Sequence, residues 1–72
     1  MQAIKHIDEL KAGDTVVLDD GRRAVVQYNG AYVTYLRPSV TMLMHRVVTV
    51  TADGSTEYVD GAWRDLVPVI VD

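Results

Sequence analysis

The acidic residues most suggestive of chemistry are Asp19, Asp20 and Asp53. Two adjacent carboxylates and a distant third could imitate the acid–base pair of a hydrolase. However, Asp20 and Asp53 each precede a glycine, and Asp-Gly is typical of tight turns, where the carboxylate bonds to its own backbone. We therefore expect turns at these positions and no catalytic residue.

The remaining reactive groups form no pattern typical of an active site. Ser39 and Ser55 lack the glycines of a nucleophile elbow, and the chain has no glycine-rich phosphate loop. Cysteine is absent, and His6 and His45 have no partner at metal-ligand spacing. The sequence therefore predicts a protein that is not an enzyme, with no cofactor and no metal.

Charge is segregated along the chain. Residues 21–52 contain no acid, whereas all ten acids lie in the two flanks. The arginines of this middle segment are Arg22, Arg23, Arg37 and Arg46. We favour pairing of these arginines with flanking acids on neighbouring strands, and the alternative is a patch for an anionic partner. A net charge of −3 disfavours a general nucleic-acid binder.

Aromatic and methionine residues are the other candidates for binding. The aromatics are Tyr28, Tyr32, Tyr35, Tyr58 and Trp63. Tyrosine is common in binding hot spots, so we take Tyr28, Tyr32 and Tyr35, together with the four arginines, as candidate partner-binding residues. Because phenylalanine is absent, we favour packing of the tyrosines, in the core and against cross-strand neighbours, over a role in binding.

A homodimer interface is expected at Met42 and Met44. They lie in a predicted strand, residues 40–51, that is apolar on both faces near its middle. Either a second chain covers one face, or the strand bends across a closed barrel. The small size of the chain, without disulfides, favours the dimer.

Turn dipeptides organise the chain into a β-meander. Asp20-Gly21, Asn29-Gly30, Asp53-Gly54 and Asp60-Gly61 predict tight turns, with positive φ at Gly21 and Gly30. The runs between them predict strands near 14–19, 22–28, 31–37, 40–51, 55–59 and 66–71. Pro38 cannot donate to a ladder, so it marks either a break between strands or an edge. The spacing of Ile4, Ile7 and Leu10 predicts a short helical element in residues 3–11, either a two-turn helix or a 3₁₀ segment, ended by Gly13.

We therefore expect one mostly β domain over residues 1–72: a short helix in 1–12, then a meander or barrel in 14–71. The segment 10–26, LKAGDTVVLDDGRRAVV, resembles the opening of a small SH3-like barrel of the KOW type, with a Gly-Asp turn, an apolar strand, a tight turn and a second strand. Ala24 stands where the KOW segment has a second glycine. The resemblance implies an SH3-like barrel or β-roll of five to six antiparallel strands, and we carry over no function from it.

The most favoured function is a non-enzymatic module that binds a protein partner, as a bacterial or phage adaptor or inhibitor. One alternative is a small nucleic-acid-binding barrel that uses arginines and tyrosines of residues 22–46. Another is an oligomer that binds a small molecule. The longest apolar runs are far shorter than the roughly 20 residues of a membrane span, so we expect a cytoplasmic protein with no membrane contact.

Overall fold

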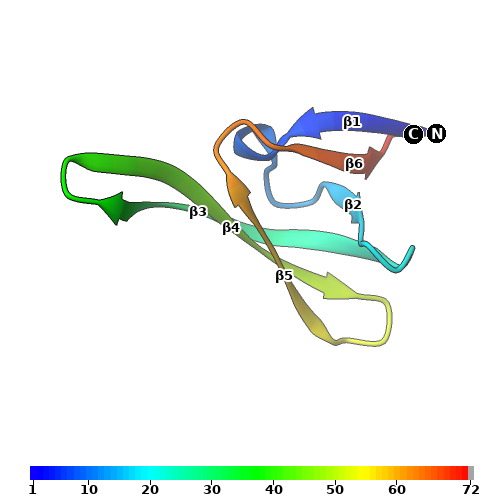
Figure 1. The fold of residues 1–72 in the computed structure, drawn as a ribbon. Helices are drawn as coiled ribbons and strands as arrows, with labels where there is room; N and C mark the ends of the chain where they lie inside the picture. Colours follow the sequence, from blue (N-terminus) through cyan, green and yellow to red (C-terminus); the bar gives the residue numbers. More distant parts are fainter. Residues whose placement is uncertain (72) are drawn as a thin grey trace.

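The computed structural model describes residues 1–71 and forms one antiparallel sheet of six strands (Figure 1). The strands are β1 (Gln2–His6), β2 (Thr15–Val17), β3 (Arg23–Arg37), β4 (Val40–Thr51), β5 (Thr56–Ala62) and β6 (Leu66–Ile70). Their order in the sheet is β1-β6-β2-β3-β4-β5, so β1 and β5 are its edges. The prediction of a mostly β fold is confirmed. The sheet is open rather than a closed barrel, since no ladder joins β1 to β5 within residues 1–71.

The predicted N-terminal helical element is only a 3₁₀ turn, and a two-turn helix in residues 1–12 is wrong. Residues 1–12 contain strand β1 and a single 3₁₀ turn, η1 (Ile7–Glu9). Ile7 and Leu10 are buried on either end of this turn, and their spacing of three matches its three residues per turn. Ile4 instead belongs to β1, where it lies opposite Pro68 and is exposed. The three evenly spaced apolar residues therefore do not lie on one helix, because Ile4 belongs to a strand and Ile7 to the 3₁₀ turn.

The core is small and aliphatic. Its buried residues are Ile7, Leu10, Val16, Ala24, Val26, Val47, Val67 and Val69. The prediction that tyrosines fill the core is wrong, because every aromatic side chain of the chain is exposed. These rings therefore lie on the surface, where they are accessible to a partner.

Two of the predicted turns are confirmed. Gly21 and Gly54 have φ of 89° and 88°, values that glycine adopts without steric cost. In the second turn the Asp53 carboxylate accepts hydrogen bonds from the Thr51 hydroxyl and from the Ser55 backbone N–H. These two bonds lower the pKa of the Asp53 carboxyl to about 2, and the bond from Thr51 has the larger effect.

The other two predicted turns are wrong. Asn29-Gly30 lies inside β3 and Asp60-Gly61 inside β5, and Gly30 has no positive φ. Residues 22–28 and 31–37 are consequently parts of one strand of 15 residues. The predicted break at Pro38 is correct, because Pro38 and Ser39 form the turn between β3 and β4.

A β-bulge at Gln27 explains why the alternation of β3 is hard to follow in the sequence. Before the bulge Ala24 and Val26 face the core, and after it Asn29 does, opposite Val47. An extra residue moves all following side chains to the other face. The inner face therefore changes from even to odd positions in the middle of one continuous strand.

Candidate functional site

The two longest strands extend beyond the sheet as a β-hairpin arm, here defined as residues 31–43. β5 pairs with β4 only as far as Met44, after which the Trp63 N–H donates to the Leu43 carbonyl at 3.0 Å. On the other side, β2 pairs with β3 only as far as Val25. Apart from this bond at Leu43, the backbone hydrogen bonds of the arm strands within residues 1–71 join them to each other, and Figure 1 shows them projecting to the left of the sheet.

The arm is apolar on both faces. Its inner face continues the core face of the sheet and pairs Val33 with Leu43. Its outer face pairs Tyr32 with Met44, and next to them Met42 lies opposite a threonine. The exposed apolar side chains of the arm are Tyr32, Val33, Tyr35, Leu36, Met42 and Leu43. A two-stranded ribbon is marginally stable alone, so burial of these side chains against a partner would stabilise it.

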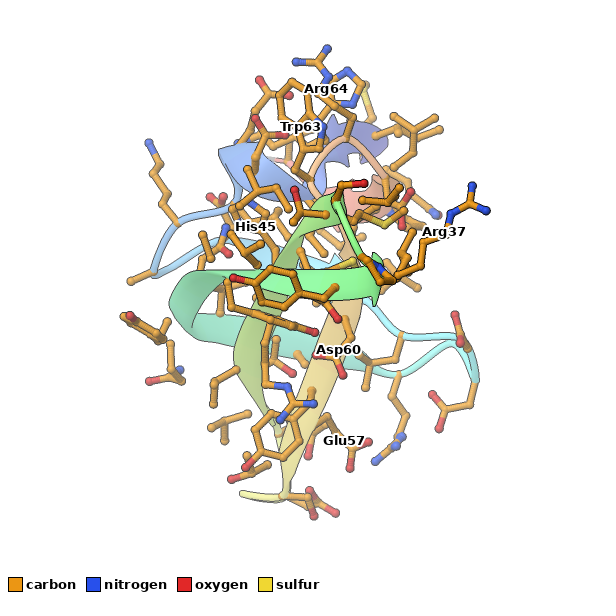
Figure 2. All side chains as sticks on the ribbon, turned by 60° about the vertical axis from the view of Figure 1, so that its left-hand side comes forward. Arg37, His45, Glu57, Asp60, Trp63 and Arg64 are labelled. Atoms are coloured by element: carbon orange, nitrogen blue, oxygen red, sulfur yellow. The ribbon has the colours of Figure 1, made fainter. Side chains whose placement is uncertain are left out.

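The tip of the arm combines a cation with exposed apolar groups. Ser39 has φ of 64° after Pro38, an arrangement typical of a type II turn. Leu36 is the extra residue of a second bulge, between Tyr35 and Arg37. The ion pairs among residues 1–71 do not include Arg37, and Figure 2 shows its side chain pointing away from the ribbon.

At the root of the arm lies the exposed indole of Trp63. The Arg64 guanidinium lies 5.0 Å from the centre of the indole ring, and its Nη2 lies 3.1 Å from His6 Nε2. His6 Nδ1 lies 3.0 Å from the Arg64 carbonyl and donates to it, which leaves Nε2 free to accept from the guanidinium. Figure 2 shows Trp63 and Arg64 together at one end of the molecule.

Two of the four predicted binding arginines pair with flanking acids. Arg22 Nε lies 2.6 Å from Asp20 Oδ2, and Arg22 Nη2 lies 3.4 Å from Glu57 Oε1. Arg46 makes two bonds to Asp60, at 2.9 and 3.0 Å. The hydrogen bond that each guanidinium donates to its aspartate is the main cause that raises the pKa of that arginine. The favoured interpretation of the charge pattern holds for Arg22 and Arg46.

The predicted binding residues do not form one patch. Arg22 and Arg23 lie at the β2–β3 turn, whereas Arg37 lies at the arm tip, at the other end of a molecule 42 Å long. Tyr28 lies on the outer face of β3, and its ring covers Gly30. The remaining predicted residues lie close together on or beside the arm: Tyr32, Tyr35, Met42, Met44 and Arg46.

A cleft opens where the sheet fails to close. It has a volume of about 390 Å³ and lies between β5 on one side and β2, the β2–β3 turn and β6 on the other. Apolar side chains in its lining include Leu18, Val59, Val67 and Pro68. Its charged side chains are Asp19, Asp20, Glu57, Asp60, Asp65 and Arg22. Hydrogen bonds from the Arg22 N–H and guanidinium lower the pKa of Asp20, which keeps it ionised.

The sequence analysis missed this cleft because it assigned the acids to separate turns. The signal was the charge pattern itself, since both acidic flanks contribute to the lining and the arm comes from the acid-free middle. Folding therefore separates an acidic surface from a surface with no acid.

The buried histidine has a structural partner. His45 Nδ1 lies 2.8 Å from Asn29 Oδ1, and Asn29 Nδ2 donates to the carbonyls of Ile7 and Leu10 at 2.9 Å each. Two carbonyl partners require the amide NH₂ on that side, so His45 Nδ1 must carry the hydrogen. Asn29 thus fastens η1 to the root of the arm. This role was missed because Asn29 was assigned to a turn.

Comparisons of the chain with protein-family models, with curated proteins and with solved structures found no match. Among residues 1–71, no group of three or more histidines and acids is arranged to hold a metal ion. No helix in the same range is long and apolar enough to cross a bilayer.

Proposed function

We propose that the chain is a non-enzymatic binding module that acts through protein–protein contact, with the arm as its binding element. The observation that carries this proposal is the arm itself, whose apolar side chains are exposed on both faces. Tyr35 is 77% exposed, Val33 54% and Leu36 59%, although each is of a type that interfaces bury. A contiguous apolar surface on a small protein marks an interaction site.

The backbone of the arm supports the same function. Both outer edges of the ribbon have unpaired N–H and C=O groups, which a partner strand can meet by β-augmentation. Trp63 extends the surface at the root with an aromatic side chain suited to a hot spot. Such a module would occupy a surface of a larger protein as an adaptor or inhibitor, in a bacterium or a phage.

A nucleic-acid partner fits the arm less well. Phosphate binding depends on several unpaired cations, and Arg37 is the single basic residue of the arm. Arg22 and Arg46 already pair with carboxylates. An apolar arm with one cation is better suited to a protein surface.

The resemblance of residues 10–26 to an SH3-like barrel fits their positions in the fold. They end η1, form β2 and its Asp-Gly turn, and begin β3. We propose that the sheet is an opened variant of that barrel. The arm then replaces the part of the meander that would otherwise curl over the core.

Site-specific photo-crosslinking tests the arm as the binding element. A benzophenone amino acid replaces Leu36 at the arm tip or, as a control, the exposed Ala52 in the β4–β5 turn. Irradiation of cells that produce the chain is expected to give protein adducts from position 36 and few from position 52. Equal yields from both positions, or adducts at position 36 that nuclease removes, would overturn the proposal.

A further inference from the structure

We propose that the cleft between β5 and β6 receives the arm tip of a second copy of this chain. The inference rests on the proposed binding role of the arm and names a second copy as one protein that the arm binds. Two copies would exchange arms, each placing Leu36 and Arg37 in the cleft of the other.

Charge complementarity is the first argument. The cleft has five carboxylates and one guanidinium, whereas the arm has Arg37 and no acid. Arg37 takes part in none of the ion pairs among residues 1–71. Within the same range the Asp19 carboxylate has neither an ion pair nor a hydrogen bond, so it is available to a cation from another molecule.

Shape and polarity are the second argument. The cleft offers apolar groups such as Leu18 and Val59 beside its acids, and the arm tip offers exposed Tyr35 and Leu36 beside its cation. Its volume of about 390 Å³ falls in the range of sites that enclose a ligand. It is large enough for a leucine and an arginine side chain.

The position of the arm excludes its own cleft as the target. In Figure 1 the arm tip lies at one end of the molecule, and the β2–β3 turn that lines the cleft lies at the other. At about 3.3 Å per residue, the four β4 residues of the arm, 40–43, and the turn carry the tip about 15 Å beyond the sheet. The tip can therefore reach only a neighbouring molecule.

Reciprocity is the third argument. Every copy has both an arm and a cleft, so one two-fold operation can satisfy both contacts in a closed dimer. Such a dimer covers the exposed arm and fills the opening of the sheet in one step. A contact between the outer faces of two arms through Met42 and Met44 would leave the cleft unfilled.

Sedimentation equilibrium at micromolar concentration tests the exchange. The native chain is expected at twice its mass of 8.0 kDa. Arg37→Glu, and separately a cleft variant with Asp19→Lys and Glu57→Lys, are each expected to weaken the dimer by about tenfold or more. The first places a carboxylate against the acidic cleft, and the second removes two of the five carboxylates that attract Arg37 and adds two cations beside it. Arg23→Glu is the matched control, since Arg23 is exposed and lies off the arm, and it should leave the dimer unchanged.

Mixing the two weakened variants gives the decisive result. In the mixture the arm with Arg37→Glu meets the cleft with two added lysines, and the arm with native Arg37 meets the native acidic cleft. An equimolar mixture should therefore recover a heterodimer that neither variant forms with itself. Circular dichroism of each variant shows whether it is folded. If the cleft variant unfolds, the native chain with the benzophenone at position 36 decides the matter, because its adducts should map to residues 17–20 or 57–68 of a second copy.

Several results would overturn this inference: a species of 8.0 kDa across the concentration range, a dimer that Arg37→Glu leaves unchanged, or folded variants that stay apart when mixed. Adducts from position 36 to a different protein alone would also overturn it and would leave the proposed function intact. Absence of protein adducts at position 36 would refute the proposed function as well.

Discussion

Replacing Asn29 with alanine should destabilise the protein strongly, although this residue stands before a glycine like an ordinary turn residue. Its amide group makes three hydrogen bonds that join η1, β3 and β4. The partners are the backbone carbonyls of Ile7 and Leu10 and the ring of His45, and all three residues are buried. The substitution removes every one of these bonds without adding a new partner.

The magnitude follows from the number of bonds. A hydrogen bond contributes about 0.5–1.5 kcal/mol net, and a buried group left without a partner costs about 1–3 kcal/mol. Because water can reach part of this half-buried site, we expect Asn29→Ala to lower the free energy of unfolding by about 2–4 kcal/mol. That is a large share of the stability of a small domain, about 0.05–0.15 kcal/mol per residue. Urea denaturation followed by circular dichroism measures it.

The control is the neighbouring Gln27→Ala. Gln27 lies at the bulge and is exposed, and its amide bonds only to the nearby Val25 carbonyl at 3.3 Å. A surface substitution of this kind is expected within about 0.5 kcal/mol of the native value. If Asn29→Ala also changed stability by less than that, Asn29 would not fasten η1 to the arm. The turn interpretation of Asn29-Gly30 would then need to be restored.

Three further substitutions test the strands and turns. Gly61→Ala should cost about 1–3 kcal/mol in thermal or urea unfolding, because its Cβ would lie 2.7 Å from Asp65 Oδ2; an unchanged midpoint would contradict this close approach. Gly30→Val should cost less than about 1 kcal/mol, since the new side chain would meet only the movable ring of exposed Tyr28, and a larger loss would indicate a strained backbone at Gly30. The lowered pKa of Asp53 predicts stability that is fully present above its ordinary value of 3.8 and lost as the pH falls through about 2. The native chain should therefore be more stable than Asp53→Asn at neutral pH, and a difference that did not shrink between pH 4 and pH 2 would refute this origin.

The sequence was sufficient to predict the strands whose signals are local. Val, Thr and Tyr between turn dipeptides correctly predicted β structure, and Asp20-Gly21 and Asp53-Gly54 form the predicted turns with positive φ at glycine. These features depend on neighbours in the chain, which a single sequence shows.

The turn predictions are wrong where a residue type that is common in turns instead makes a contact with a residue distant in the sequence. Asn29 bonds to Ile7 and Leu10, which precede it by 22 and 19 positions. At Gly61 the Asp65 side chain lies where a Cβ would be, so only glycine fits without a shift. The same residue types suit positive φ, so the local pattern cannot separate the two uses. The bulge at Gln27 moves the inward-facing side chains of β3 from even to odd positions. The sequence of this one strand therefore resembles that of two strands.

The arm explains why the apolar pattern of residues 31–43 was ambiguous. A strand that is apolar on both faces is typical either of a buried interior strand or of an interface. In this fold the core ends near His45, so the same alternation continues past it into side chains such as Val33 and Leu43 that remain exposed. We propose that another molecule buries them, and the acid-free composition of the arm together with the acidic cleft is the reason for proposing a second copy.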